Sequence, residues 1–363
     1  MVGVTLWLSW EYKIFSLLLL AAVVLSLFIA TFFPQRKDIS IPIVVTGVAL
    51  VLGEVAVPFF SIIGREHAHY DKSSSYAAGG YFERVSGVGY RPSAGLHTSK
   101  KFTSDGEVIY DVRYTIGVDG YRKDVVSDDF DVYLYGGSFT FGEGLNDNET
   151  IPYFLHELYG IKVKNVGVHG YGLNQALFNI EQGVSAPSGN GVNVLLTAPW
   201  HALRSSCKPD YSVGTPRYEL TPSGVSLTGF CSSGGLVYRI FRESNIFSLA
   251  YRGISNKKNE IRDEDIGLYI AIIRRIAELS NSNGIRLIIA YIDATEDQLA
   301  TTSWTNQSLI NELTRISEVV DVTLAERRED LAEKYFIHEH DQHPSKLANK
   351  RRAEILYASF LHE

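Results

Sequence analysis

The sequence predicts an α/β fold with a parallel sheet, placed after a strongly hydrophobic N-terminal part. The first observation is a series of short apolar segments, followed by stretches with helical spacing, between residue 131 and the C-terminus. The second is that glycine-rich and polar loops follow these segments, where a parallel sheet carries its ligand site. The third is the length of 363 residues, which is enough to bury a sizeable core without metals or disulfides.

Two long apolar runs stand near the N-terminus. Residues 14–33 contain no charged side chain, and residues 39–63 contain one, Glu54. At about 1.5 Å per residue, each run is long enough for a hydrocarbon core of about 30 Å. We expect two transmembrane helices; the alternatives are buried core helices, or a cleavable signal peptide for the first run. Glu54 is either a functional intramembrane carboxylate or a helix-packing acid, and no role is assigned to it.

The charges between these runs predict the orientation of the chain. Arg36 and Lys37 lie in the short connecting turn, which the positive-inside rule keeps cytoplasmic. Cys207 and Cys231 are close enough in sequence to pair in an oxidising compartment, which favours the same orientation. The expected localisation is therefore the inner membrane, with everything after residue 63 on the periplasmic or exoplasmic side.

Two segments separate the apolar runs from the main domain. Residues 64–80 are polar, small and aperiodic, which is typical of a juxtamembrane linker. Residues 81–128 alternate apolar and polar positions, and Asp-Gly pairs at 105–106 and 119–120 indicate hairpin turns. We expect a small β-rich module over this second segment.

The main domain is expected over residues 129–363. Its candidate strands are residues 131–135, 161–166, 192–197 and 285–291. Apolar residues at a period near 3.6 predict a helix over 264–280, and a final amphipathic helix is expected over 348–361. Strands that alternate with helices indicate a parallel sheet covered on both faces. Residues 204–236, rich in Ser, Gly and Pro, are expected to form a loop insertion.

Composition and spacing exclude several partners. With 34 Lys and Arg against 41 Asp and Glu, the net charge of −7 argues against nucleic acid. Two cysteines exclude a cysteine-rich zinc module. His338, His340, Asp341 and His343 suggest a metal site as an alternative, but they lack an HExxH or comparable ligand spacing. We therefore expect no metal and no other cofactor.

Ser138 is the first candidate for chemistry. It stands in the segment GGSFTFGEG, just past the end of the first predicted strand. A serine on a tight strand-to-helix turn leaves its hydroxyl facing open space, as a nucleophile requires. The alternatives are a phosphate-cradling loop, for which the P-loop spacing and lysine are missing, and a glycine-rich turn with an idle serine.

Two further segments hold polar residues at strand ends. The loop NVGVHGYGLNQ carries glycines, and a backbone N–H there could face a developing oxyanion. His169 in this loop is either catalytic or idle. Near the C-terminus, Asp341 stands two residues before His343, and such an Asp can fix the tautomer of the imidazole and stabilise its cation.

Together these segments resemble the SGNH hydrolase superfamily, also called GDSL-like esterases, from residue 131 to the C-terminus. The resemblance implies a three-layer sandwich with Ser138 as nucleophile, His343 as general base and Asp341 as the residue that orients it. It also implies an oxyanion hole formed by the backbone of Ser138 and Gly170. The segments GYRP and TIGVDGYR resemble those that precede this domain in membrane-tethered bacterial members.

The chain departs from the pattern of this family at three places. Gly137 stands where the family has Asp, and the last block is D-x-H rather than the commoner D-x-x-H. The third block reads TAPWHALR and lacks the Asn that donates to the oxyanion. His201 or Asn174 could supply this donor, whose removal typically costs ~10²–10³ in rate.

The resemblance implies a membrane-anchored serine esterase or O-acyltransferase. Its expected substrates are acyl esters, first of all acetyl esters, of envelope or exported polysaccharide, with a lipid ester as the other candidate. Expected partners are this carbohydrate or lipid, the membrane and proteins of an envelope complex. The alternative is a non-catalytic module that binds a glycan or assembles such a complex. The acyl group, the acceptor and the oligomeric state stay open.

Overall fold

The structure is a computed structural model that describes most of the chain after residue 68. The described residues are 28, 31, 45, 69–71, 73–126, 128–187, 191–232, 260–324 and 335–361. Within them, no helix has the length and apolar character that crossing a membrane requires. The predicted membrane runs, 14–33 and 39–63, lie outside the described residues except for three isolated positions. The fold below belongs to the compact unit Glu66–Ser232 with Glu260–Glu363.

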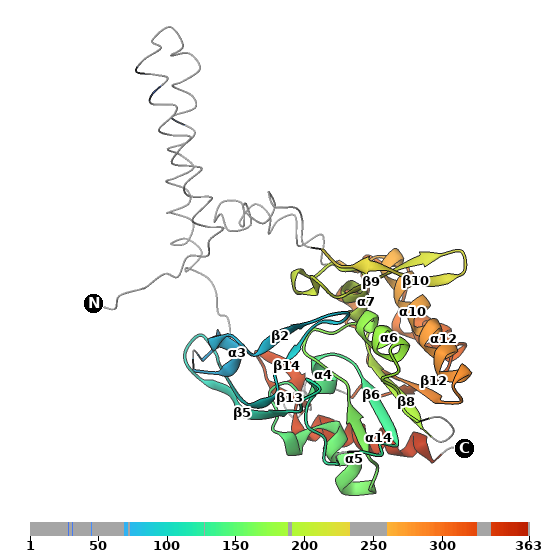
Figure 1. The fold of residues 1–363 in the computed structure, drawn as a ribbon, viewed down its shortest axis with the longest axis horizontal. Helices are drawn as coiled ribbons and strands as arrows, with labels where there is room; N and C mark the ends of the chain where they lie inside the picture. Colours follow the sequence, from blue (N-terminus) through green and yellow to red (C-terminus); the bar gives the residue numbers. More distant parts are fainter. Residues whose placement is uncertain are drawn as a thin grey trace. The chain divides into compact units, whose positions relative to one another are not determined.

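The centre of this unit is a five-stranded parallel sheet (Figure 1). Its strand order is β12-β11-β8-β6-β7. The strands are β6 (Val132–Tyr135), β7 (Val163–Asn165), β8 (Val192–Thr197), β11 (Arg286–Tyr291) and β12 (Glu318–Asp321). The predicted α/β class and its four predicted strands are confirmed. β12 was not predicted, because charged residues stand at both ends of a strand of only four residues.

Alternate residues of each strand point to opposite faces of the sheet, and helices cover both faces. One face packs against α5 (Ile151–Tyr159) and α14 (Lys346–Phe360). The other packs against α6 (Leu173–Glu181), α10 (Asp263–Ser282) and α12 (Asn306–Thr314). In β11, for example, Ile288 belongs to the first core and Ile289 to the second. Burial on both faces explains the continuous apolar character of these strands.

Local sequence signals fix the ends of the helices. The hydroxyl of Thr150 accepts a hydrogen bond from the backbone N–H of Tyr153 at the start of α5, and Gly160 ends this helix in a left-handed conformation. Ser345 caps α14 in the same way through the N–H of Ala348. The shorter helical segments are α3 (Ser75–Ala78), α4 (Ser138–Phe141), α7 (His201–Ser205), α11 (Glu296–Leu299), η2 (Asp147–Glu149) and η3 (Asp210–Ser212).

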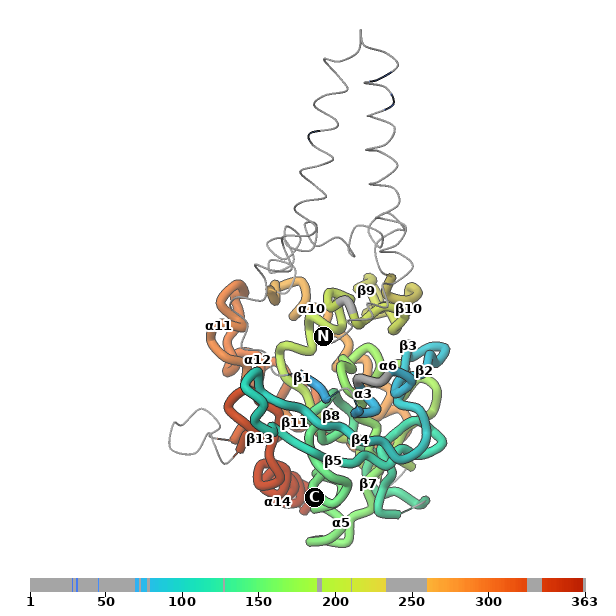
Figure 2. The backbone as a smooth tube through the Cα atoms, turned by 90° about the vertical axis from the view of Figure 1, so that its left-hand side faces the viewer, coloured from blue at the N-terminus to red at the C-terminus, as the bar shows by residue number. Residues whose placement is uncertain are grey.

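The β-rich segment forms an antiparallel sheet and a separate hairpin. The sheet has the order β1-β4-β5, with β1 (His69–Tyr70), β4 (Gly95–Phe102) and β5 (Val108–Ile116). The hairpin joins β2 (Phe82–Val85) and β3 (Gly89–Pro92). β5 lies against β13 (Phe336–His338), as Figure 2 shows. The first Asp-Gly pair turns the β4–β5 hairpin as predicted. The second also lies in a turn, closed by a single β-bridge between Ile116 and Arg122.

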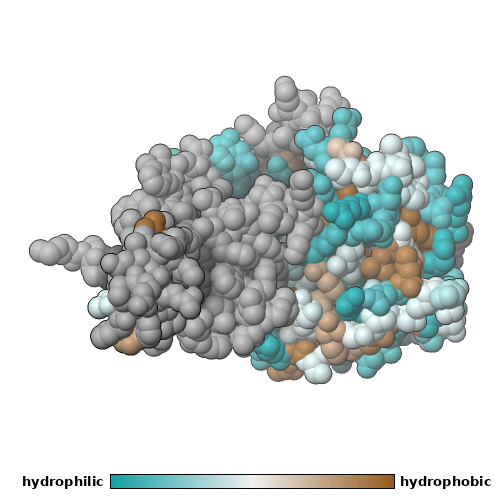
Figure 3. Space-filling model, turned by 90° about the horizontal axis from the view of Figure 1, so that it is seen from above, coloured by the Kyte–Doolittle hydropathy of each residue, from teal (hydrophilic) through white to brown (hydrophobic). Residues whose placement is uncertain are grey.

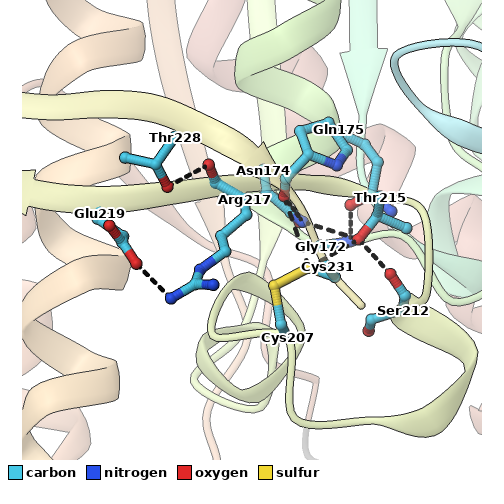
Figure 4. Close-up of a disulfide and its surroundings, with 11 residues drawn as sticks. Gly172, Asn174, Gln175, Cys207, Ser212, Thr215, Arg217, Glu219, Thr228 and Cys231 are labelled. Carbon is cyan, nitrogen blue, oxygen red and sulfur yellow. Dashed lines mark hydrogen bonds and ion pairs between the residues drawn. A yellow bond between two sulfur atoms is a disulfide. The ribbon is translucent and has the colours of Figure 1, made fainter. Parts of the chain in front are cut away.

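Two segments are more ordered than their composition predicts. The predicted linker 64–80 contains β1, in which Tyr70 pairs with Lys101 of β4. The predicted loop insertion contains the hairpin of β9 (Pro216–Thr221) and β10 (Gly224–Phe230). A disulfide joins Cys207 and Cys231 beside this hairpin, with 5.5 Å between their Cα atoms (Figure 4). Short strands with mixed composition lack the periodicity that would reveal them in the sequence.

The surface of the described part is mixed in character. On the face seen in Figure 3, hydrophobic residues form small patches between hydrophilic ones. Large exposed apolar side chains also occur on the β9–β10 hairpin, where Leu220, Leu227 and Phe230 are each more than two-fifths exposed. Scattered exposed apolar residues are common on folded proteins and indicate no site by themselves.

Candidate active site

The turn that carries Ser138 is shaped by two glycines. β6 ends at Tyr135, and α4 begins at Ser138. A Cβ on Gly136 would collide with the side chain of Thr140 and the carbonyl of Leu196. A Cβ on Gly137 would lie 2.6 Å from Arg204 Nη1. The space next to the backbone of Gly137 is thus occupied, which gives a physical reason for the absence of the Asp that the family pattern has there.

Three residues from two distant parts of the chain meet at this turn. His343 Nε2 lies 3.0 Å from Ser138 Oγ, although 205 positions separate them. His343 Nδ1 lies 2.6 Å from Asp341 Oδ1, and the backbone N–H of His343 also donates to this oxygen at 3.0 Å. Both residues belong to β14 (Asp341–Pro344), which pairs with β13. The structure therefore brings the three predicted catalytic residues together in the order nucleophile, base and orienting acid.

Lys101 of β4 completes the surroundings of Asp341. Its Nζ lies 2.7 Å from Asp341 Oδ2, and the side chain of Asp341 is only 2% exposed. Burial alone would raise the pKa of Asp341, but His343 and Lys101 together lower it to about 2. Asp341 is therefore ionised at neutral pH and acts as an acceptor for the Nδ1–H of His343.

A second carboxylate approaches the same imidazole from its other side. Glu143 Oε2 lies 3.4 Å from His343 Nε2 and 2.8 Å from His169 Nδ1. Burial lowers the pKa of His343, but the charges of Glu143 and Asp341 outweigh it and raise this pKa above its ordinary value. Sequence reasoning missed both Glu143 and Lys101, since neither stands in a motif with a catalytic spacing.

Two backbone N–H groups are candidates for the oxyanion hole. Among the described residues, the backbone N–H groups of Ser138 and Gly170 have no hydrogen-bond acceptor. Gly170 has a left-handed conformation with φ +72°, and a Cβ there would lie 2.7 Å from Tyr90 Oη. Glycine is therefore required at this position of the loop after β7.

His201 lies close to the backbone of the nucleophile turn. Its Nε2 is 3.4 Å from the place that a Cβ on Gly137 would take. Its Nδ1 lies 3.1 Å from Thr197 Oγ1, which in turn lies 3.2 Å from the hydroxyl of Tyr269. Burial and the charge of Arg204 lower the pKa of His201 well below its ordinary value. This side chain is thus neutral and carries one proton that either ring nitrogen can hold.

The prediction of Asn174 as an oxyanion donor is corrected by its contacts. Its side-chain amide donates to the carbonyl of Pro216 at 2.8 Å and to Thr215 Oγ1 at 3.3 Å. Figure 4 shows these contacts beside the disulfide. Because Asn174 is fully buried and its N–H groups are used, it holds the β9 strand and not an oxyanion. This contact between the first turn of α6 and β9 could not be foreseen from the sequence.

A cavity opens next to the imidazole of His343. Its volume is about 540 Å³, and its walls include Phe139, Trp200, Asp293, Gln298, Phe336 and His340. The ring of Phe139 packs edge-on against both His343 and Trp200, with centroid distances of 5.6 and 5.8 Å. A volume of this size is typical of sites for small molecules or for one end of a larger ligand.

The metal alternative finds no support in the described part of the chain. No group of three His, Cys, Asp or Glu side chains there could hold a metal ion. The rings of His338 and His340 lie 5.4 Å apart near the β13–β14 turn, whereas Asp341 and His343 are directed to each other.

The comparisons with known proteins give structural neighbours but no family assignment by sequence. No family model matches the chain, and no curated protein matches it. Similar solved structures include a member of the lipolytic protein G-D-S-L family from Veillonella parvula DSM 2008. It has 12% identity and a TM-score of 0.39, with 65% of this chain and 100% of that chain covered.

A second similar structure is a carbohydrate esterase family 2 enzyme with a carbohydrate-binding domain from Corynascus thermopiles (Myceliophthora fergusii). It has 10% identity and a TM-score of 0.30, with 67% of this chain and 69% of that chain covered. The Veillonella parvula protein belongs to the same group that the sequence of this chain resembles. At these identities and TM-scores, the likeness assigns no activity to this chain.

Proposed function

We propose that this protein is a serine-dependent enzyme that breaks acyl esters, either as an esterase or as an O-acyltransferase. One observation carries the proposal: Ser138 Oγ, the imidazole of His343 and the carboxylate of Asp341 form a continuous hydrogen-bonded array. A buried serine next to a base that is itself oriented by an acid is the arrangement that activates a hydroxyl.

The proposed reaction has two acyl-transfer steps. His343 Nε2 takes the proton of Ser138, whose Oγ forms a bond to the ester carbonyl carbon. The tetrahedral intermediate then collapses, the bond to the leaving oxygen breaks, and Nε2 gives its proton to that oxygen. A second hydroxyl, from water or from an acceptor, attacks the acyl-serine by the same route in reverse and restores Ser138.

The oxyanion of each intermediate needs donors in place of the missing Asn. The backbone N–H groups of Ser138 and Gly170 are two candidates, because no acceptor uses them in the described part of the chain. His201 is the third. His201 is neutral, and its Nε2 lies beside the nucleophile turn. It can donate to the oxyanion when the ring proton stands on Nε2.

We further propose that the ester is an acyl group, first of all acetyl, on an envelope or exported polysaccharide. The cavity beside His343 has room for an acceptor or leaving group, and its aromatic walls offer flat apolar surfaces. The apolar N-terminal runs and the disulfide support an anchored enzyme on the oxidising side of the inner membrane. Proteins of an envelope complex are its proposed partners. The missing Asn of the third block is the feature that favours the non-catalytic alternative.

An acyl-enzyme assay tests this proposal. The intact protein in detergent is mixed with p-nitrophenyl acetate and quenched in acid, and its peptides are analysed by mass spectrometry. We expect acetyl on the Ser138 peptide and a burst of nitrophenol, both lost in Ser138→Ala and retained in the exposed Ser226→Ala control. An added oligosaccharide that collects the acetyl group identifies a transferase, whereas free acetate identifies an esterase. Acetyl on no serine, or equally on both variants, contradicts the proposal.

A further inference from the structure

Glu143 lies beside the array without belonging to its three predicted members. Its backbone N–H donates to the carbonyl of Ser138 at 3.0 Å, so it follows the nucleophile by less than two helical turns. The residue is 7% exposed, and its carboxylate therefore depends on protein partners for its stability. An acidic residue in this position needs an explanation, because carboxylates are rarely buried unless they are paired.

The partners of Glu143 form a buried chain of hydrogen bonds. Tyr70 Oη donates to Oε1 at 2.9 Å, and His169 Nδ1 lies 2.8 Å from Oε2. On the other side of this ring, Tyr81 Oη lies 2.9 Å from His169 Nε2. Burial raises the pKa of Tyr81 well above its ordinary value, so its hydroxyl keeps its proton. Because an ionised carboxylate can only accept, His169 Nδ1 donates to Glu143 Oε2.

Glu143 is ionised within this network. Burial alone would raise the pKa of Glu143, but His343, His169 and the Tyr70 hydroxyl together hold it below its ordinary value. The negative charge of Glu143 stands close to His343, whose Nε2 lies 3.4 Å from Oε2 and gains a proton in the proposed reaction.

The charged groups around His343 come from three elements. Asp341 faces Nδ1 from β14, and Glu143 faces Nε2 from the loop after α4. Lys101 of β4 stands behind Asp341, and its charge lowers the pKa of His343. The imidazole is thus enclosed by one carboxylate at each nitrogen. The β-rich segment supplies one contact to each carboxylate: Lys101 to Asp341 and Tyr70 to Glu143.

We propose that Glu143 is a positioning residue of this enzyme, which stabilises the imidazolium form of His343 through its contact with Nε2. The inference rests on the proposed function, since the imidazolium forms when Nε2 takes the proton of Ser138. That proton then lies between Ser138 Oγ and Glu143 Oε2 until the leaving oxygen receives it. Glu143 forms and breaks no covalent bond. Its influence has a consequence for the resting enzyme, in which His343 keeps its proton to a higher pH than an isolated histidine.

The test is the pH dependence of the reaction between Ser138 and a fluorophosphonate. Glu143→Gln keeps the shape of the side chain and removes its charge. The acid limb is the part of the pH–rate profile in which labelling slows as His343 becomes protonated. We expect this limb to move to lower pH by about 1–3 units, the pKa shift that an opposite charge at this distance produces. Tyr70→Phe removes one hydrogen bond to Glu143 but keeps its charge, so it is expected to move this limb by less than Glu143→Gln does. Glu157→Gln makes the same charge change on the exposed face of α5 and is expected to leave the limb in place.

An NMR titration of the carbon-labelled histidines in the intact protein separates this inference from the proposed function. The signal of His343 is identified by its absence in His343→Gln. A lower pKa of His343 in Glu143→Gln, together with the shifted limb, supports the inference. If Ser138 is labelled but neither the pKa of His343 nor the acid limb of the labelling rate moves in Glu143→Gln or Tyr70→Phe, the inference is wrong and the proposed function stands. If the pKa of His343 shifts but Ser138 is labelled at no pH, the proposed function falls, and the role of Glu143 in it falls with it.

Discussion

The ion pair of Lys101 and Asp341 offers a quantitative prediction. Lys101→Met removes the positive charge and keeps most of the side-chain volume. At 2.7 Å, two unit charges attract by about 6 kcal/mol at an effective dielectric of 20, and the loss of hydration of both groups offsets part of this. Removing one partner of a buried pair typically costs about 3–5 kcal/mol. Because Asp341 keeps two hydrogen bonds from His343, we expect the free energy of unfolding to fall by an amount at the lower end of this range, about 3 kcal/mol.

The assay is urea unfolding followed by tryptophan fluorescence. The matched control is Lys162→Met, which breaks a pair of similar length, 2.8 Å, with side chains that are 38% and 82% exposed. Solvent screens such an exposed pair, so its loss is expected to change the free energy of unfolding far less than the loss of the Lys101 pair. Because Lys101 also lowers the pKa of His343, its removal is expected to move the acid limb of Ser138 labelling upward, opposite to Glu143→Gln. The reasoning would be refuted if Lys101→Met lowered the free energy of unfolding no more than the control Lys162→Met does.

Three further predictions concern the neighbouring groups. His201→Ala lowers ester turnover by ~10²–10³, whereas Asn174→Ala leaves turnover unchanged and costs about 1–3 kcal/mol of stability; steady-state kinetics and unfolding check both. Replacing Cys207 and Cys231 by Ser opens a loop with a sequence separation of 24 and costs about 3.5 kcal/mol, measured by unfolding with and without reductant. The lowered pKa of Asp341 contributes about 2 kcal/mol to the free energy of unfolding at pH values above 3.8, the pKa in the unfolded chain. This contribution is lost as the pH falls through about 2. The free energy of unfolding of Asp341→Asn is therefore expected to depend less on pH in acid.

The sequence was sufficient to identify the central array because each of its members stands in a local pattern. Ser138 follows a buried strand within a glycine-rich turn, and the pair Asp341 and His343 has a spacing that lets one side chain bond the other. The strands β6, β8 and β11 were predicted because burial on both faces makes them continuously apolar.

The residues that surround the array could not be predicted, because their roles depend on long-range contacts. Lys101 stands in an alternating strand, where a lysine normally faces solvent, and it meets Asp341 across 240 positions of the chain. Glu143 stands between two glycines and has the composition of an exposed turn. Asn174 was predicted wrongly as a donor, because it lies in α6 and its side-chain amide donates to β9. Tyr70 lies in a segment that reads as a linker, and only its pairing with β4 brings it to Glu143.

The central claim is that Ser138 is a nucleophile activated by His343. Its most direct test is to treat the intact protein in detergent with a fluorophosphonate probe and to map the adduct by mass spectrometry. We predict a single adduct on Ser138, absent in Ser138→Ala and strongly reduced in His343→Ala. No adduct on the folded protein, or an adduct that forms equally fast in His343→Ala, would contradict the account.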